Sequence, residues 1–401
     1  MPWNRYDACT GNKKHHDMND VATSKFALRQ HLLHLGFAFG VPREVVSERL
    51  NRHFGPEKAK AYADLLADNT LTGNDRENAI YDFFDDLTAA NLLRSLSTDV
   101  TLDTCYFLYE KAAAQFTAGA RVLELACWTG GFSSFIAEHH PECSVTGIDR
   151  ASKIISICNQ LYRSPNLDFV RWDYLRRNKP AAVLPADILL CSLGTNYDCP
   201  PDAYAAFDSM SVRSSNGYLS EKNEASHYFQ HWRQSARPGA SLFAVLRTFT
   251  FPRFLAFIDA AQEAGWKPLL DDCTAVECAG NKEHIPFFTF QAERSSVIDE
   301  DVALSHFTRV INRTDQWGTV NGPAAMGVYR SLANRQVLAK NETRDKSGLL
   351  IVEEVGLCGS LGYLYRHDTF PRVDLTLLSR SMAENIVNRA KSAAAQVGGS
   401  E

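Results

Sequence analysis

Acidic side chains end three neighbouring predicted strands. Glu124, Asp149 and Asp173 each lie at or just beyond the end of a short apolar or β-branched run. The carboxyl ends of parallel strands share one edge of a sheet, where ligands bind. A carboxylate there can accept hydrogen bonds from both hydroxyls of a ribose or attract a cationic group. We therefore expect the three acids to converge on one ligand.

A turn of small residues follows the first of these strands. Residues 126–131 read ACWTGG and precede a predicted helix. Small residues at the first strand-to-helix turn let the backbone approach a ligand at the switch point of a sheet.

The elements that position these residues alternate between residues 100 and 293. Short apolar runs, beginning with 122–125, 144–148 and 167–171, are separated by amphipathic helices. Such alternation predicts an α/β fold with a doubly wound parallel sheet. Two further strand-like runs, 272–280 and 285–294, are joined by a short turn-rich loop.

Residues 124–130 (ELACWTG), together with Asp149 and Asp173, resemble the cofactor motifs of the Rossmann-like (class I) S-adenosylmethionine-dependent methyltransferases. The later runs 237–242 and 264–266 follow the order of the same family. The resemblance implies S-adenosylmethionine as the cofactor. By this resemblance, Glu124 would orient the methionine part of the cofactor, and the backbone at Gly130 would pass close to the cofactor. Asp149 would hold the ribose and not serve the core, and Asp173 and Trp172 would meet the adenine. The expected cofactor site also includes Ala126, Trp128, Arg150, Ser192 and Leu193.

The turn departs from the family pattern at two positions. The family usually has three glycines at alternate positions, and this sequence has Ala126 and Trp128 at the first two. Ala126 adds only a methyl group, but the Trp128 ring must point away from the cofactor or form part of the pocket. Glu124 argues against a dinucleotide, because its carboxylate would repel a pyrophosphate, whereas a sulfonium with an ammonium group would be attracted.

Catalytic candidates are expected beyond the carboxyl ends of the fourth and fifth strands. Asn196 and Tyr197 follow the fourth strand and can form hydrogen bonds there, although a simple turn explains them equally well. His227 and His231 lie four residues apart on one face of a predicted helix, where they could supply a base. No third ligand accompanies them, so we predict no metal site.

Two tyrosines precede the first strand in a predicted helix. Tyr106 and Tyr109 are expected near the edge of the cofactor, where they could close over it, although such residues more often pack.

The flanking regions have different patterns. Residues 1–99 predict a helical N-terminal unit that could act as a lid, with Pro42 and Pro56 at helix starts and Gly55 after a helix end. The pattern of residues 294–401 predicts an α+β unit of unknown role. It is helix-like through Val310 and again through Leu338, and then predicts three strands and a last helix over 380–394. The middle domain would span 100–293.

The composition limits the partners. The net charge is -5 with interspersed signs, which disfavours nucleic acid as a substrate. No apolar segment long enough for a signal peptide or membrane span is present in the sequence, so we expect a cytoplasmic protein without a membrane partner. A homodimer is expected on general grounds.

We therefore expect a transferase that methylates a small molecule. A first alternative, motivated by Trp128, is an enzyme that transfers or cyclises the aminobutyrate portion of S-adenosylmethionine and releases methylthioadenosine. A second is a non-catalytic protein that binds S-adenosylmethionine or a partner.

Overall fold

The computed structural model describes most of the chain between residues 18 and 397. The described residues are 18–68, 70–71, 73–95, 98–173, 178–194, 213, 216–248, 251–278, 283–307, 316–321, 325, 329–330, 332, 335–344, 346, 348, 350–358, 361–368 and 373–397. The catalytic candidates Asn196 and Tyr197 lie outside these ranges.

Helices form the N-terminal region, as predicted. They are α1 (Met18–His34), α2 (Arg43–Ala67), α3 (Gly73–Phe83), α4 (Leu87–Arg94) and α5 (Thr98–Ala112). Pro42 occupies the N-cap of α2, and Gly55, with φ of 75°, interrupts that helix just before Pro56. Glycine adopts this left-handed backbone without steric cost, so the predicted helix end at Gly55 is seen as a break within α2.

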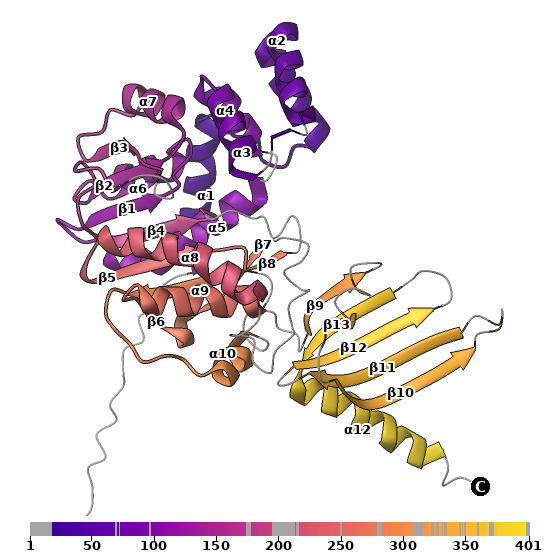
Figure 1. Ribbon diagram of the computed structural model, residues 1–401. Helices are drawn as coiled ribbons and strands as arrows, with labels where there is room; N and C mark the ends of the chain where they lie inside the picture. Colours follow the sequence, from indigo (N-terminus) through magenta and orange to yellow (C-terminus); the bar gives the residue numbers. More distant parts are fainter. Residues whose placement is uncertain are drawn as a thin grey trace, which may run out of the picture.

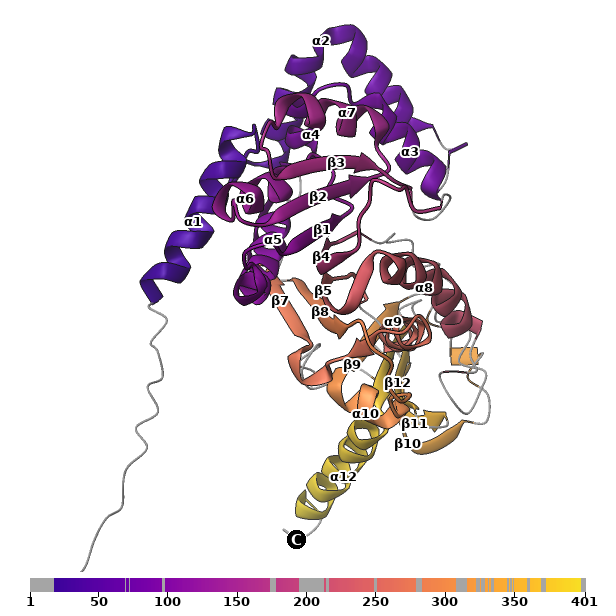
Figure 2. The ribbon, with the colours of Figure 1, turned by 90° about the vertical axis from the view of Figure 1, so that its left-hand side faces the viewer.

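A mixed sheet with a parallel centre forms the middle of the chain (Figure 2). Its strand order is β3-β2-β1-β4-β5-β8-β6, and β7 pairs with β8. The strands are β1 (Arg121–Leu125), β2 (Ser144–Asp149), β3 (Leu167–Arg171), β4 (Ala186–Ser192), β5 (Ala236–Val245), β6 (Lys267–Pro268), β7 (Thr274–Cys278) and β8 (Glu283–Gln291). Strands β1 to β5 pair in parallel, whereas β8 runs antiparallel to β5, β6 and β7. The predicted doubly wound sheet is confirmed, and the two further strand-like runs form the antiparallel pair β7 and β8.

Helices cover both faces of this sheet. The crossover helices are α6 (Gly131–His139), α7 (Ser152–Leu161), α8 (Asn216–Gln234) and α9 (Phe251–Glu263). Because side chains alternate along a strand, Val122 packs in one hydrophobic core with the N-terminal helices and α6. Leu123 and Leu125 pack on the other face, in a core with α8 and α9. The parallel centre is therefore buried on both faces, which is typical of such sheets.

A second sheet lies in the C-terminal region, to one side of the first (Figure 1). After α10 (Glu300–His306), its antiparallel order is β10-β11-β12-β13-β9, with α12 packed against one face. These elements are β9 (Gln316–Asn321), β10 (Gln336–Arg344), β11 (Leu350–Cys358), β12 (Leu361–Asp368), β13 (Val373–Ser379) and α12 (Arg380–Val397). The α+β pattern is confirmed, but the helix expected through Leu338 is wrong at that residue, because Leu338 lies in strand β10. It is a largely exposed edge strand, so burial imposes little alternation on its sequence.

No helix in the described ranges combines the length and the apolar content needed to cross a membrane.

Candidate functional site

The turn after β1 has a left-handed backbone at alternate residues. φ is 56° at Ala126, 49° at Trp128 and 71° at Gly130. Residues other than glycine rarely adopt this region, at a cost of about 1–3 kcal/mol each. The backbone therefore follows the path that alternate glycines would take, although two of the three positions carry side chains. Such strain is concentrated at functional sites.

Backbone hydrogen bonds hold this turn against the neighbouring strand. Cys127 N donates to Ile148 O at 2.9 Å, and Gly130 N donates to Cys127 O at 2.9 Å. A Cβ atom added to Gly130 would lie 2.3 Å from Phe169 Cε1. Close packing with β3 therefore requires glycine at position 130 independently of any ligand.

The Trp128 side chain points away from the sheet edge, into the helical region. Its ring centroid lies 4.6 Å from that of Tyr81 and 6.2 Å from that of Phe84, and its Nε1 donates to Ala90 O at 3.4 Å. The side chain is buried. Of the two arrangements that the sequence left open, the structure has the first, and the ring packs against the N-terminal helices.

Glu124 is buried on the face that α6 covers. Its carboxylate accepts a hydrogen bond from Ser133 Oγ. Burial raises the pKa of Glu124 to about 7, against the opposing effects of the Ser133 hydrogen bonds and of Arg94. A cationic ligand group would favour the ionised form of this carboxyl.

Asp149 links the ends of β1 and β2. Its Oδ2 accepts a hydrogen bond from Trp128 N at 2.8 Å, and its Oδ1 accepts one from Ala151 N at 2.9 Å. Burial raises the pKa of this carboxyl. The expectation that Asp149 serves a ribose and not the core is therefore corrected: its carboxylate is buried and stabilises the turn. The two carboxylate oxygens can accept further hydrogen bonds, and a ribose hydroxyl could donate them.

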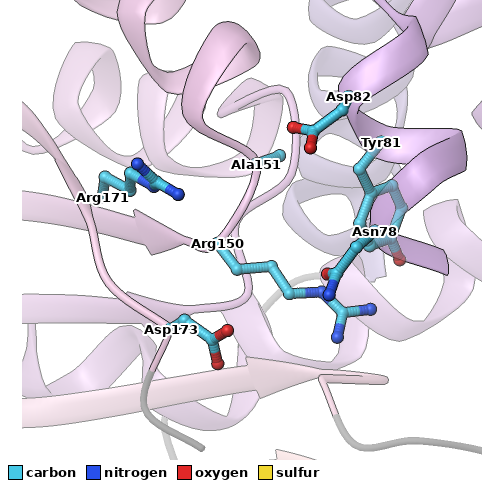
Figure 3. Close-up of a pocket in the computed structure, with 7 residues that line it drawn as sticks. All are labelled: Asn78, Tyr81, Asp82, Arg150, Ala151, Arg171 and Asp173. Atoms are coloured by element: carbon cyan, nitrogen blue, oxygen red, sulfur yellow. The ribbon is translucent and has the colours of Figure 1, made fainter. Parts of the chain in front are cut away.

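A polar cavity of about 160 Å³ lies between the ends of β2 and β3 and helix α3 (Figure 3). In Figure 3, Arg150 extends from the end of β2 toward α3, and Asp173 lies on the opposite side of its guanidinium. Arg150 Cζ lies 4.9 Å from the centroid of the Tyr81 ring. The lining residues are Asn78, Tyr81, Asp82, Arg150, Ala151, Arg171 and Asp173.

Trp172 lies elsewhere. Its side chain is 1% exposed in the core beneath α8, and its ring meets His231 edge to face at a centroid distance of 5.9 Å. Trp172 is not among the residues that line the cavity, so this arrangement gives no support to the expected contact between its ring and adenine. Its backbone N donates to Asp149 O at 2.9 Å, so it holds the end of β3 against β2.

Ser192 and Leu193 lie at the same edge of the sheet, at the end of β4. Ser192 Oγ is 2.9 Å from Thr104 Oγ1 of α5, and Leu193 has φ of 59°. A Cβ on Gly194 would lie 3.0 Å from the Cβ of Ala126, so the turns after β1 and β4 are in close contact. The strained residues Ala126, Trp128 and Leu193 thus all occur in the turns that follow β1 and β4.

The two tyrosines of α5 face away from this cavity. Tyr109 Oη lies 3.0 Å from His140 Nε2, and its ring packs against Phe116, which precedes β1. Tyr109 is therefore at the amino edge of the sheet, which corrects the expectation that it closes over the cofactor. Tyr106 is buried, and Lys25 of α1 lies 5.7 Å from its ring centroid, so it packs at the interface of two helices.

The histidines of α8 are also separate from the cavity. His227 is exposed, and His231, whose pKa is lowered by burial, lies against Trp172. Within the described ranges, no group of three or more potential metal ligands comes together. This arrangement gives no support to the catalytic roles expected for this pair.

Helix α3 contributes three residues to the cavity wall that the sequence pattern does not predict as site residues. Asn78, Tyr81 and Asp82 are spaced three and four residues apart and share one face of that helix. The signal was this polar face opposite the apolar stripe of Ile80 and Phe83. Nothing in the sequence indicated that it would meet the sheet edge.

Residues 122–214 match the methyltransferase domain family. The matching segment contains the strands β2 to β4, most of β1 and the turn after β1, within a sheet of Rossmann-like order.

Individual relatives match over short segments. Phthiotriol/phenolphthiotriol dimycocerosates methyltransferase of Mycobacterium tuberculosis is 39% identical over 67 residues, which is 16% of this chain and 25% of that relative. The corresponding Mycobacterium leprae protein is 36% identical over 67 residues, with the same coverages. The chain thus matches about a quarter of the length of these relatives.

Similar solved structures include three methyltransferases. Magnesium protoporphyrin IX methyltransferase of Synechocystis PCC 6803, with bound S-adenosylhomocysteine, matches with a TM-score of 0.37 and 13% identity over 55% of this chain and 100% of that chain. For 1,6-didemethyltoxoflavin-N1-methyltransferase of Burkholderia thailandensis, with bound 1,6-didemethyltoxoflavin and S-adenosylhomocysteine, the TM-score is 0.36 and the identity 15%, over 57% of this chain and 93% of that chain. For the W203A mutant of the 16S rRNA (adenine(1408)-N(1))-methyltransferase of Catenulisporales acidiphilia, the TM-score is 0.32 and the identity 19%, over 48% of this chain and 93% of that chain.

Proposed function

We propose that this protein is an S-adenosylmethionine-dependent methyltransferase that acts on a small molecule. The observation that carries the proposal is the left-handed backbone at Ala126, Trp128 and Gly130. This is the conformation of a glycine turn, maintained at a cost in free energy at the first strand-to-helix turn, where doubly wound sheets bind their ligands.

The donor set fits this cofactor. Acidic groups suit a ligand that carries a sulfonium and an ammonium group, and the cavity wall has Asp82 and Asp173 beside Arg150 and Arg171. At about 160 Å³ it is smaller than the roughly 300–1,000 Å³ of pockets that enclose whole ligands. It therefore suits the adenosyl end, with Asp173 of its wall at the adenine. Asp149, which accepts a hydrogen bond from Ala151 of the wall, would meet the ribose. Glu124 would orient the ammonium group.

When bound, S-adenosylmethionine supplies an electrophilic methyl group, so the protein has chiefly to position the acceptor. In this proposal the acceptor meets the carboxyl ends of β4 and β5, where Asn196 and Tyr197 remain candidates. The helical N-terminal region, residues 1–99, would act as a lid, which the contact of α3 with the cavity supports. The net charge of -5 favours a small molecule over a nucleic acid.

Calorimetry with purified protein tests the proposal. We expect both S-adenosylmethionine and S-adenosylhomocysteine to bind, and binding of neither would contradict it. Incubation with candidate acceptors should then release S-adenosylhomocysteine. Release of methylthioadenosine would instead indicate transfer or cyclisation of the aminobutyrate portion. Trp128 motivated that alternative, but its ring packs against Tyr81 and Phe84 and gives it no support.

A further inference from the structure

In the proposed function the adenine of the cofactor lies in the cavity, and the flat face of this base needs a surface to stack on. Trp172 does not provide one. Trp172 is 1% exposed and absent from the cavity wall. Among the described residues that line the cavity, Tyr81 is the one with an aromatic ring. It comes from α3, a helix outside the segment that matches the methyltransferase domain family.

The Tyr81 ring is held by contacts with two cofactor-edge residues. The Trp128 ring lies 4.6 Å from it, between centroids, at an interplanar angle of 49°. Arg150, the residue after Asp149, places its guanidinium over the ring at 4.9 Å (Figure 3). The guanidinium lies over this face of Tyr81, and both side chains line the cavity, so a flat base can stack on the ring once Arg150 moves away from it.

We propose that Tyr81 supplies the ring on which the adenine of the cofactor stacks, with the Arg150 guanidinium against the other face of the base. The inference rests on the proposed function and adds a binding residue to it. Bases stack on tyrosine rings and on guanidinium planes alike, so insertion of adenine replaces one stacking contact with two. Trp128 is then a positioning residue, because it holds Tyr81 at the cavity instead of touching the ligand.

Two nucleosides separate this role from a general effect on the site. S-adenosylhomocysteine and 5′-methylthioadenosine share the adenosyl group, and only the first carries the aminobutyrate portion. Tyr81→Leu should weaken the binding of both by a similar factor, about 10-fold or more, because stacking acts on the base alone. Tyr81→Phe keeps the ring and should bind both within about threefold of the native protein.

Tyr109→Leu is the matched control, since it removes a packed tyrosine at the opposite edge of the sheet. It should leave both affinities unchanged. Native affinity of Tyr81→Leu for either nucleoside would overturn the inference, as would an equal loss in Tyr109→Leu. Failure of the proposed function gives a different result, in which the native protein itself binds neither nucleoside.

A measurement on the native protein covers the case in which Tyr81→Leu does not fold. An 8-azidoadenosyl analogue of S-adenosylhomocysteine, cross-linked by light, should label the peptide that contains residues 73–83. Labelling that is competed by S-adenosylhomocysteine but reaches no residue of 73–83 and not Arg150 would overturn the inference.

Discussion

The backbone N–H of Trp128 donates a hydrogen bond of 2.8 Å to Asp149 Oδ2. The carboxylate at the end of β2 therefore fixes the strained turn that follows β1. The second carboxylate oxygen accepts from Ala151 N and fixes the start of the next crossover. In this arrangement one acidic side chain sets the shape of the site before any ligand enters, and a change at Asp149 should affect both stability and binding.

Asp149→Ala should lower the free energy of unfolding by about 1–3 kcal/mol, because two buried N–H groups lose their charged acceptor. Affinity for S-adenosylhomocysteine should fall by at least about tenfold, since the turn loses its support and the ribose loses its partner. Asp149→Asn retains one acceptor oxygen and should be less affected in both respects. Urea unfolding and calorimetry measure the two quantities, and unchanged affinity in Asp149→Ala would contradict the assignment.

Substitution by glycine should affect stability little at Ala126 and strongly at Trp128. Ala126→Gly relieves a left-handed alanine but gives the unfolded chain more freedom, so stability should stay within about 1 kcal/mol of the native value. Trp128→Gly also removes a buried ring that packs on Tyr81 and should cost about 3 kcal/mol or more. Urea unfolding of both variants checks the pair. A stable Trp128→Gly would show that this ring does not anchor the helices.

The main sheet could be predicted because burial shapes its sequence. Strands such as β1, buried over most of their length, appear as short apolar runs. The exposed edge strand β10 carries no such signal, and its first residues, through Leu338, are expected in a helix. The parallel topology also placed Asp149 and Asp173 near one edge, because carboxyl ends of parallel strands coincide.

The remainder of the site depends on packing between distant segments. Tyr81 reaches the cavity because α3 packs against Trp128, and no local pattern encodes that contact. Tyr109 was misplaced for a geometric reason. Helix α5 meets the cofactor edge at Thr104, 2.9 Å from Ser192, and five residues later it has risen about 7.5 Å toward the opposite edge.

Tyr109→Phe tests that correction. It removes the hydroxyl that lies 3.0 Å from His140 Nε2 and should lower the free energy of unfolding by about 1 kcal/mol. Affinity for S-adenosylhomocysteine should not change, since the residue is at the amino edge of the sheet. Calorimetry and urea unfolding on the same preparation separate the effects. A loss of affinity without a loss of stability would return Tyr109 to the cofactor site.

Glu124 should make cofactor binding depend on pH. Its pKa is about 7 because the carboxyl is buried, and only the ionised form attracts an ammonium group. Affinity for S-adenosylhomocysteine should therefore rise with pH up to about 7 and then level off. Glu124→Gln should abolish this rise and lower affinity about tenfold above pH 7, by the loss of one charge-assisted interaction. Calorimetry across this range would contradict the role if the native and variant profiles were parallel.

The same shift implies that Glu124 lowers stability at high pH. The folded state holds the proton up to about pH 7, whereas the unfolded carboxyl releases it near its ordinary value of 4.5. Between these values the folded state binds more protons, so the free energy of unfolding falls as pH rises. Each unit of pKa difference corresponds to about 1.4 kcal/mol, so ionisation of the Glu124 side chain lowers the free energy of unfolding by about 3 kcal/mol above pH 7. Glu124→Gln does not titrate, so relative to the native protein it should gain about that much stability between roughly pH 5 and pH 8. Urea unfolding at the two values measures the change, and an equal difference at both would show that Glu124 is already ionised in the folded protein.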